Sequence, residues 1–185
     1  ISFWKNLGKP KKIIIVELGP GDGSLCNDLL KVFKKFNDFY NCLEINLLEI
    51  SYKLKKTQNE KIKNSKVKWI SKINEVKGGP VVFLGNEFFD ALPIKQICKR
   101  KNLLVEKHVA LKNNKKELKF LYKKIDKKLI KYDKIVSLYK NKDILEYPIN
   151  AIEYLSEISK KINKFNGAIL IFDYGYILNK NENTL

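Results

Sequence analysis

Three glycines alternate with other residues in a short segment that carries carboxylates before and after it. Gly19, Gly21 and Gly23 occupy this loop, and Glu17 stands two positions before the first of them. Residues without a Cβ let the backbone approach a bound nucleotide closely. Glu49 follows a second apolar segment, where an acidic side chain can accept hydrogen bonds from ribose hydroxyls. Together these residues predict a nucleotide-binding site.

The spacing of the glycines favours one class of nucleotide over another. A dinucleotide fingerprint reads G-x-G-x-x-G, whereas this loop reads G-P-G-D-G. The carboxylate of Glu17 would repel a pyrophosphate, but it suits a ligand with an α-amino group and a sulfonium. We therefore expect S-adenosyl-L-methionine as cofactor, with Ile50 beside Glu49 in the same site. A purely structural turn between a strand and a helix is the alternative for the loop.

A second polar group follows a later apolar run and consists of Asn86, Glu87 and Asp90. Methyl transfer from a sulfonium is an in-line displacement, so the protein mainly aligns the acceptor lone pair and stabilises spreading charge. The carboxylate of Glu87 can hold a guanidinium bidentately, and Asn86 can accept from an amine or bind the amino-acid end of the cofactor. Asp90 belongs to the same catalytic set or caps a short helix. Metal ligation is not expected.

The elements that must position these residues follow from hydrophobic periodicity. Short apolar runs predict strands at 13–16, 43–50, 67–70, 81–84 and 168–172, and helical spacing predicts helices at 25–37, 51–62 and 151–162. Alternation of strand and helix indicates an α/β fold with a parallel sheet. Ser24 is placed to cap the first of these helices. The glycine loop and the acidic residues then lie at the carboxyl ends of strands.

Residues 94–145 form an insertion that does not fit a simple helix. Val105, Lys107, Val109 and Leu111 alternate with their neighbours, as do Leu118, Phe120 and Tyr122, and Asn113-Asn114 lies between the two runs. This pattern predicts a β-hairpin. We expect the insertion to be a candidate acceptor-binding region.

The formal net charge of +17 raises the question of a nucleic-acid partner. All basic residues except Arg100 are lysines, and they are dispersed through every segment. Arginine is the residue suited to bidentate phosphate and guanine contacts, so a solvated lysine surface is the favoured interpretation. Nucleic acid remains the less favoured partner.

Cysteine and histidine content argues against two other kinds of site. Cys26, Cys42 and Cys98 make an odd count without CxxC spacing, which favours reduced thiols over disulfides or zinc. His108 is the single histidine, so a histidine-based triad is not expected. No apolar run reaches the roughly 20 residues that a membrane span requires.

Four motifs in this order resemble the MidA-like methyltransferases, a family with bacterial and mitochondrial members. They are I-V-E-L-G-P-G-D-G-S-L at 15–25, L-E-I-S at 48–51, N-E-F-F-D-A-L-P-I at 86–94 and I-F-D-Y-G at 171–175. The resemblance implies a Rossmann-like class I methyltransferase sheet with strand order 3-2-1-4-5. Family members usually carry arginine where Asp22 stands and proline where Tyr52 stands.

The resemblance also implies an activity, namely N-methylation of arginine in a protein substrate, with a respiratory complex I subunit as acceptor. It implies the cytoplasm in a bacterium, or the mitochondrial matrix in a eukaryote. Two alternatives stay open: an RNA or DNA N-methyltransferase, and a non-catalytic cofactor-binding assembly factor. Nucleic-acid amino methyltransferases carry an Asn/Asp-Pro-Pro-aromatic motif, whereas Asn86 is followed by Glu-Phe-Phe.

The family sheet has seven strands, and only five are predicted here besides the hairpin. The chain also contains no methionine. We therefore expect residues 1–185 to be a single incomplete domain whose remaining strands are missing, and which is inactive alone.

Overall fold

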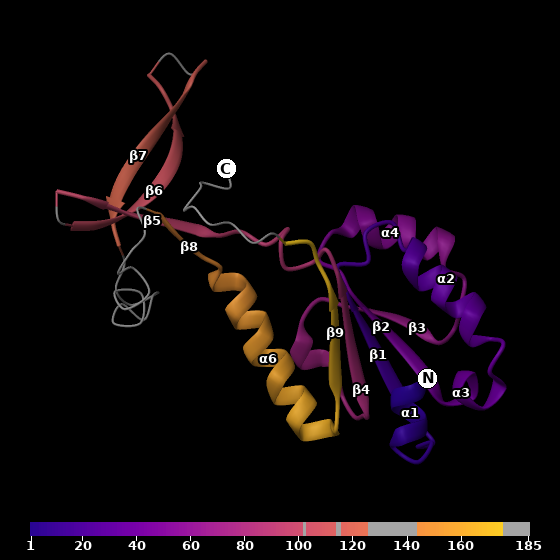
Figure 1. The fold of residues 1–185 in the computed structure, drawn as a ribbon. Helices are drawn as coiled ribbons and strands as arrows, with labels where there is room; N and C mark the ends of the chain where they lie inside the picture. The colour runs from indigo at the N-terminus through magenta and orange to yellow at the C-terminus, as the bar shows by residue number, and fades with distance from the viewer. Residues whose placement is uncertain (102, 114–115, 126–143, 176–185) are drawn as a thin grey trace. The chain divides into compact units, whose positions relative to one another are not determined.

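The computed structural model describes residues 1–101, 103–113, 116–125 and 144–175 (Figure 1). These residues fall into two compact units, Ile1–Ala91 with Glu153–Tyr174 and Leu92–Ile152. The first unit contains α1 (Ser2–Asn6), β1 (Ile13–Leu18), α2 (Ser24–Phe33), α3 (Asn37–Cys42), β2 (Leu43–Leu48), α4 (Tyr52–Lys61), β3 (Val67–Ile70), the 3₁₀ helix η1 (Ile73–Glu75), β4 (Val81–Asn86), β9 (Ala168–Phe172) and α6 (Ile149–Phe165) from Glu153 onward.

The first unit is built on a five-stranded parallel sheet with the order β3-β2-β1-β4-β9. This order confirms the predicted 3-2-1-4-5 arrangement, because the fifth predicted strand is β9. Leu18 at the end of β1 pairs with Leu48 of β2 and with Gly85 of β4. The carboxyl ends of these three strands are therefore level, and ligands of open α/β sheets bind at that edge.

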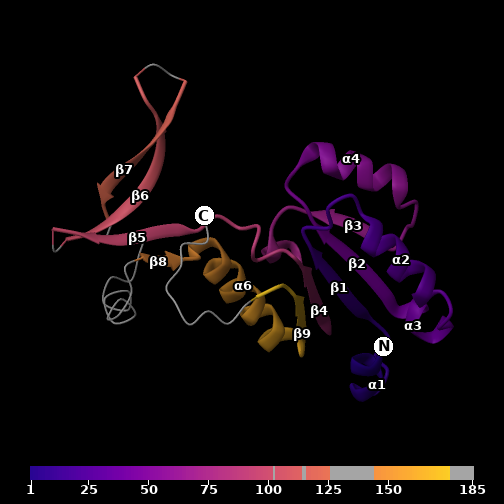
Figure 2. The same ribbon diagram turned by 45° about the horizontal axis from the view of Figure 1, so that its top comes forward.

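The strands β1, β2 and β4 are covered on both faces, which explains their continuous apolar runs, whereas Leu170, Ile171 and Phe172 of the edge strand β9 are exposed. Helices α2 and α4 lie on one side of the sheet and α6 on the other (Figures 1 and 2). Ile13 and Ile15 belong to the core cluster on the α2 side, whereas Ile14 and Val16 belong to the cluster that includes Ile158 of α6. Side chains alternate along a strand, so Glu17 faces the α2 side.

The helices differ from the predicted ones at several points. The single helix predicted for 25–37 is two, because α2 ends at Phe33 and α3 begins at Asn37. Ser24 does not cap α2: Gly23 holds the N-cap position with φ +82°, and Ser24 is the first helical residue. The Oδ1 atom of Asp22 accepts a hydrogen bond from the Ser24 amide at 3.0 Å instead.

Helix α4 confirms the helix predicted for 51–62, and its composition is polar. Ser51 caps it, its side chain accepting from the Leu54 amide at 3.3 Å. One polar side chain of the helix, that of Gln58, is nevertheless fully buried.

The second unit is an antiparallel sheet with the order β7-β6-β5-β8, drawn in Figure 2. Its strands are β5 (Lys95–Arg100), β6 (Leu103–Leu111), β7 (Leu118–Lys124) and β8 (Ile144–Tyr147). The predicted hairpin is confirmed, since Val109 pairs with Phe120 and Leu111 with Leu118. Asn114 of the predicted turn lies outside the described residues. Strands β5 and β8 were not predicted.

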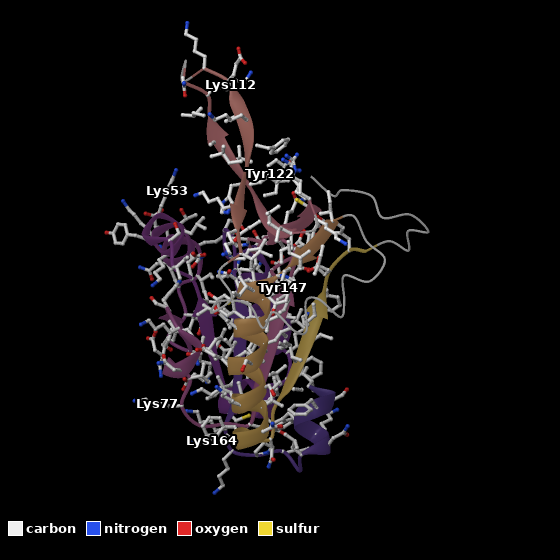
Figure 3. The ribbon with its side chains drawn as sticks, turned by 90° about the vertical axis from the view of Figure 1, so that its left-hand side faces the viewer. Lys53, Lys77, Lys112, Tyr122, Tyr147 and Lys164 are labelled. Carbon is white, nitrogen blue, oxygen red and sulfur yellow. The ribbon has the colours of Figure 1, made fainter. Side chains whose placement is uncertain are left out.

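Lysine side chains extend outward from separate elements of each unit. Figure 3 labels Lys53 on α4, Lys77 after η1 and Lys164 at the end of α6, together with Lys112 beyond β6. All four are exposed. This dispersal fits the predicted solvated lysine surface.

Two kinds of feature are absent from the part of the chain that the structure describes. None of its helices combines the length and apolar composition needed to cross a membrane. None of its His, Cys, Asp and Glu side chains gather in a group of three or more that could hold a metal ion.

Candidate active site

A pocket of about 300 Å³ lies in the first unit at the carboxyl ends of β1 and β4. Five of the residues predicted from the sequence line it together: Glu17, Gly19, Gly21, Asn86 and Glu87. Its wall also includes Leu18, Pro20, Asp22, Ser24 and Leu25. The structure thus places predicted cofactor-binding and catalytic residues around one cavity.

The three glycines of the loop have different surroundings. A Cβ on Gly21, whose φ is +55°, would meet no described atom within 4 Å, so this glycine leaves the pocket side of the loop open. A Cβ on Gly19 would lie 2.9 Å from Cδ2 of Phe88. Gly23 does not line the pocket; its missing Cβ makes room for Ile62, whose Cδ1 would be 2.8 Å away. The alternating glycines therefore serve both ligand access and packing.

Glu17 is a buried carboxylate that lines the pocket and is 4% exposed. Its Oε2 atom has no hydrogen-bond partner among the described residues. Burial raises the pKa of Glu17 to about 7, because a low-dielectric surrounding disfavours the charged form. A buried acceptor without a partner is costly, and a cationic donor in the pocket would satisfy it.

The charge of Glu17 also affects the neighbouring thiol of Cys26. Burial first, and the charge of Glu17 second, raise the pKa of Cys26 to about 12. The thiol is therefore neutral at physiological pH and is not a nucleophile. This agrees with the predicted reduced, structural cysteine.

Glu49 does not line the pocket but lies one residue beyond the end of β2, 7% exposed. Its Oε1 accepts from the Ser51 amide at 2.7 Å, and its Oε2 accepts from Nε2 of Gln58 at 3.2 Å. The carboxylate is thus held in one orientation while keeping lone pairs for a further donor. Ile50, predicted in the same site, is 78% exposed and does not line the pocket.

Glu87 follows the carboxyl end of β4 with an unusual backbone. Its φ is +48°, in the left-handed region that favours glycine. The Glu87 amide donates to the carbonyl oxygen of Phe172 at 2.8 Å, which joins this turn to the end of β9. Such strain in a non-glycine residue clusters at functional sites.

Asp90 lies away from the pocket lining but near the end of β9. The nearby carboxylate of Asp90 raises the pKa of Tyr174, and the charges of Asp173 and Glu87 add to this effect. The predicted alternative, a helix cap, is wrong, because no helix begins at Asp90: the chain has no helix between β4 and β5.

The aromatic residues after Glu87 are packing residues. Phe88 makes edge contacts with Phe89 and Tyr154, at centroid distances of 5.2 and 5.1 Å. Both phenylalanines pack against the core cluster on the α6 side. Neither phenylalanine lines the pocket, so both serve packing.

Two further contacts of the glycine loop were missed from the sequence. Lys61 forms an ion pair with Asp22 at 2.7 Å, and Gln58 donates to the Gly21 carbonyl at 2.7 Å. Both residues belong to a lysine-rich helix without a distinguishing pattern. Their positions in the sequence do not predict these contacts, because the contacts depend on how α4 packs across the loop.

Comparison with known proteins adds evidence on the family. The whole chain, residues 1–185, matches the model of a family described as "Putative S-adenosyl-L-methionine-dependent methyltransferase". A Xenopus tropicalis protein named protein arginine methyltransferase NDUFAF7, mitochondrial, is 31% identical over 213 residues, which cover 96% of this chain and 46% of that protein. The human protein of the same name is 27% identical, with 95% of this chain and 45% of that protein covered. The chain spans about half the length of the curated relatives that it matches.

Two crystal structures from Burkholderia thailandensis have the same fold. One, titled a "likely methyl transferase" bound to S-adenosyl-homocysteine, superposes with a TM-score of 0.68 at 17% identity, covering 95% of this chain and 44% of that one. A native structure from the same superfamily gives a TM-score of 0.71 at 18% identity, covering 95% and 46%. Because the family model matches its full length and its motifs resemble the MidA-like proteins, the chain belongs to this family of S-adenosyl-L-methionine-dependent methyltransferases.

Proposed function

We propose that this protein uses S-adenosyl-L-methionine to methylate a nitrogen of arginine in a protein substrate. The observation that carries the proposal is the carboxylate of Glu17, buried and unpartnered among the described residues, in a glycine-loop pocket that also contains Asn86 and Glu87. The names of the curated relatives, protein arginine methyltransferases, support the choice of acceptor.

The residues present fit the cofactor. Its α-amino group is the kind of cationic donor that Glu17 lacks, and the open side of Gly21 admits a ligand against the backbone. Glu49 keeps acceptor capacity for ribose hydroxyls, although two donors already hold it. Once bound, the cofactor supplies an activated methyl group.

The acceptor side of the reaction falls to Asn86, Glu87 and Asp90. Arginine has a pKa above about 12, so no ordinary side chain deprotonates it beforehand. Glu87 would instead hold the guanidinium and direct one nitrogen towards the pocket, with Asn86 accepting a second hydrogen bond. Asp90, close enough to Tyr174 to raise its pKa, would add negative charge near the ends of β4 and β9.

The insertion, residues 94–145, is the proposed acceptor-binding region. Its hairpin exposes two cross-strand apolar pairs, Val109 with Phe120 and Leu111 with Leu118. Exposed apolar surface of this kind suits a protein partner. A respiratory complex I subunit, in the mitochondrial matrix of a eukaryote or its bacterial counterpart in the cytoplasm, is the substrate class that the motif resemblance implies.

The test is methyl transfer by the whole protein from methyl-labelled S-adenosylmethionine. Arginine-containing protein acceptors should be labelled, and the same acceptors with arginine replaced by lysine should not. Labelling of RNA instead, with a steep salt dependence, would replace this proposal by the nucleic-acid alternative. Cofactor binding without transfer to any acceptor would identify a non-catalytic assembly factor.

Glu49→Ala is expected to weaken cofactor binding by about 1–3 kcal/mol, the scale of lost hydrogen bonds to a charged group. Isothermal titration calorimetry with S-adenosylmethionine measures this. Glu49→Gln is the matched control, because it keeps the size and should lose less affinity. Equal affinity of Glu49→Ala and the unchanged protein would remove Glu49 from the site.

A further inference from the structure

We propose that Gln58 is a positioning residue that joins the two halves of the cofactor site, the glycine loop and Glu49. This inference rests on the proposed function and deepens it. Gln58 does not line the pocket, its hydrogen bonds to Gly21, Glu49 and Trp69 reach only one lining residue, Gly21, and no motif of the sequence includes it. Its effect on ligand binding would pass through the groups that it holds.

The side chain of Gln58 is fully buried and has three partners on three different elements. Its Nε2 atom donates to the carbonyl oxygen of Gly21 at 2.7 Å and to Oε2 of Glu49 at 3.2 Å. Its Oε1 atom accepts from the indole Nε1 of Trp69 on β3 at 2.8 Å. One amide therefore links the glycine loop, the end of β2 and β3.

The orientation of this amide follows from the chemistry of its partners. An indole N–H can only donate, so the atom opposite Trp69 must be the oxygen. A backbone carbonyl and a carboxylate can only accept, so the atom facing Gly21 and Glu49 must be the nitrogen. A flipped amide would lose all three hydrogen bonds. By fixing the amide orientation, Trp69 keeps both N–H groups of Gln58 directed at Gly21 and Glu49.

The consequence for Glu49 is a carboxylate with a single orientation. Oε1 is held by the Ser51 amide and Oε2 by Gln58, so neither oxygen is free to turn away. Without Gln58, the side chain would be held at one oxygen only. Affinity for ribose hydroxyls would fall, because ordering the carboxylate would then accompany each binding event.

The consequence for the loop is a defined peptide plane after Gly21. A trans peptide directs its N–H opposite to its C=O, so holding the Gly21 carbonyl towards α4 turns the Asp22 amide to the other side. Helix α4 also packs closely against Gly23, where a Cβ would lie 3.3 Å from Cγ of Gln58. This packing fixes the distance between α4 and the glycine loop. The glycine loop and Glu49 are thereby held at fixed positions relative to each other.

A second link between α4 and the loop provides the matched control. Lys61 pairs with Asp22 at 2.7 Å, but the two side chains are 36% and 60% exposed. An exposed ion pair contributes little, whereas a buried amide with three partners holds its neighbours firmly. Lys61→Met should leave ligand affinity within about twofold.

The experiment measures the affinity of the whole protein for S-adenosylhomocysteine and for its 2′-deoxy-ribose analogue. Gln58→Met, similar in size but without hydrogen bonds, should lower affinity for S-adenosylhomocysteine by about 10- to 100-fold. The preference for the ribose hydroxyl should shrink in the same variant. A purely structural glutamine would lower both affinities equally, and that result would overturn the proposal.

A double-mutant cycle with Glu49→Ala gives an independent readout. If Gln58 acts through Glu49, the double variant should bind little more weakly than Glu49→Ala alone. Full additivity contradicts the proposal. Should Gln58→Met lose its cooperative melting, Trp69→Phe carries the same expectation, because it removes the donor that orients the amide. Failure of the unchanged protein to bind S-adenosylhomocysteine would refute the proposed function and this inference with it. Normal binding by the unchanged protein, with an unaltered preference for the ribose hydroxyl in Gln58→Met, would overturn the inference alone.

Discussion

Glu87→Gln is expected to lower turnover by about 100-fold while changing the affinity for S-adenosylmethionine by less than about twofold. The substitution keeps the shape of the side chain and removes the charge that would hold a guanidinium. Glu87 lines the pocket at the end of β4, and its backbone is tied to Phe172 of β9. Single-turnover methylation of an arginine acceptor separates this effect from cofactor binding.

Glu87→Gly sharpens the same test. Glu87 has a φ of +48°, so glycine should relieve strain and raise the free energy of unfolding by about 0.5–1 kcal/mol. Activity should nevertheless be lost, because the carboxylate is absent. Asp90→Asn, outside the pocket lining, should reduce turnover less than Glu87→Gln. Undiminished turnover on arginine in Glu87→Gln would end the guanidinium-holding role, and a parallel loss of cofactor affinity would move Glu87 to the cofactor side.

Glu17→Gln is expected to stabilise the protein at pH 8 while weakening its binding of S-adenosylmethionine by about tenfold or more. Burial raises the pKa of Glu17 from its usual 4.5 to about 7. Between these values the folded protein keeps the proton and the unfolded chain releases it. The stability that depends on the neutral form is therefore complete below pH 4.5 and is lost as the pH rises through 7.

This linkage has an upper limit of about 3 kcal/mol at 1.36 kcal/mol per pH unit, since the pKa moves from 4.5 to about 7. Glutamine is neutral at every pH. The free energy of unfolding of Glu17→Gln should therefore rise relative to that of the unchanged protein between pH 5 and pH 8. Urea unfolding at both pH values measures the gain. The same titration predicts that cofactor affinity of the unchanged protein falls as the pH drops through 7, because a cationic ligand requires the ionised carboxylate.

Glu44→Gln on β2 is the control for pH dependence. Partial burial raises the pKa of Glu44, but the ion pair with Lys12 at 3.1 Å outweighs this effect, and the pKa is lowered overall. Glu44 is therefore charged at pH 5 and at pH 8, and its replacement should change stability equally at both. An equal change for Glu17→Gln would show that its carboxylate is not buried as described.

Features of this protein that depend on local sequence could be predicted from the sequence alone. The β-branched run of β1 and the apolar run of β4 predict buried parallel strands, because strands covered on both faces are mostly apolar. The apolar run at 168–172 also predicts a strand, but Leu170, Ile171 and Phe172 of this edge strand are exposed. The glycine loop after β1 needs residues without a Cβ, and Gly19 and Gly21 line the pocket as expected. The β6–β7 hairpin followed from the partly alternating pattern of its two strands and the Asn113-Asn114 pair between them.

Other features were decided by tertiary structure. Strands β5 and β8 pair across a long stretch of sequence, and neither has a periodic pattern that would identify it. Gln58 is buried because α4 packs across the glycine loop, which no helical pattern in a lysine-rich segment predicts. The sequence indicated that Glu17 belongs to a ligand site, but only the fold buries its Oε2 without a described partner and raises its pKa. Desolvation and long-range hydrogen bonds arise from elements that meet only after folding, so the residue types and their spacing do not contain them.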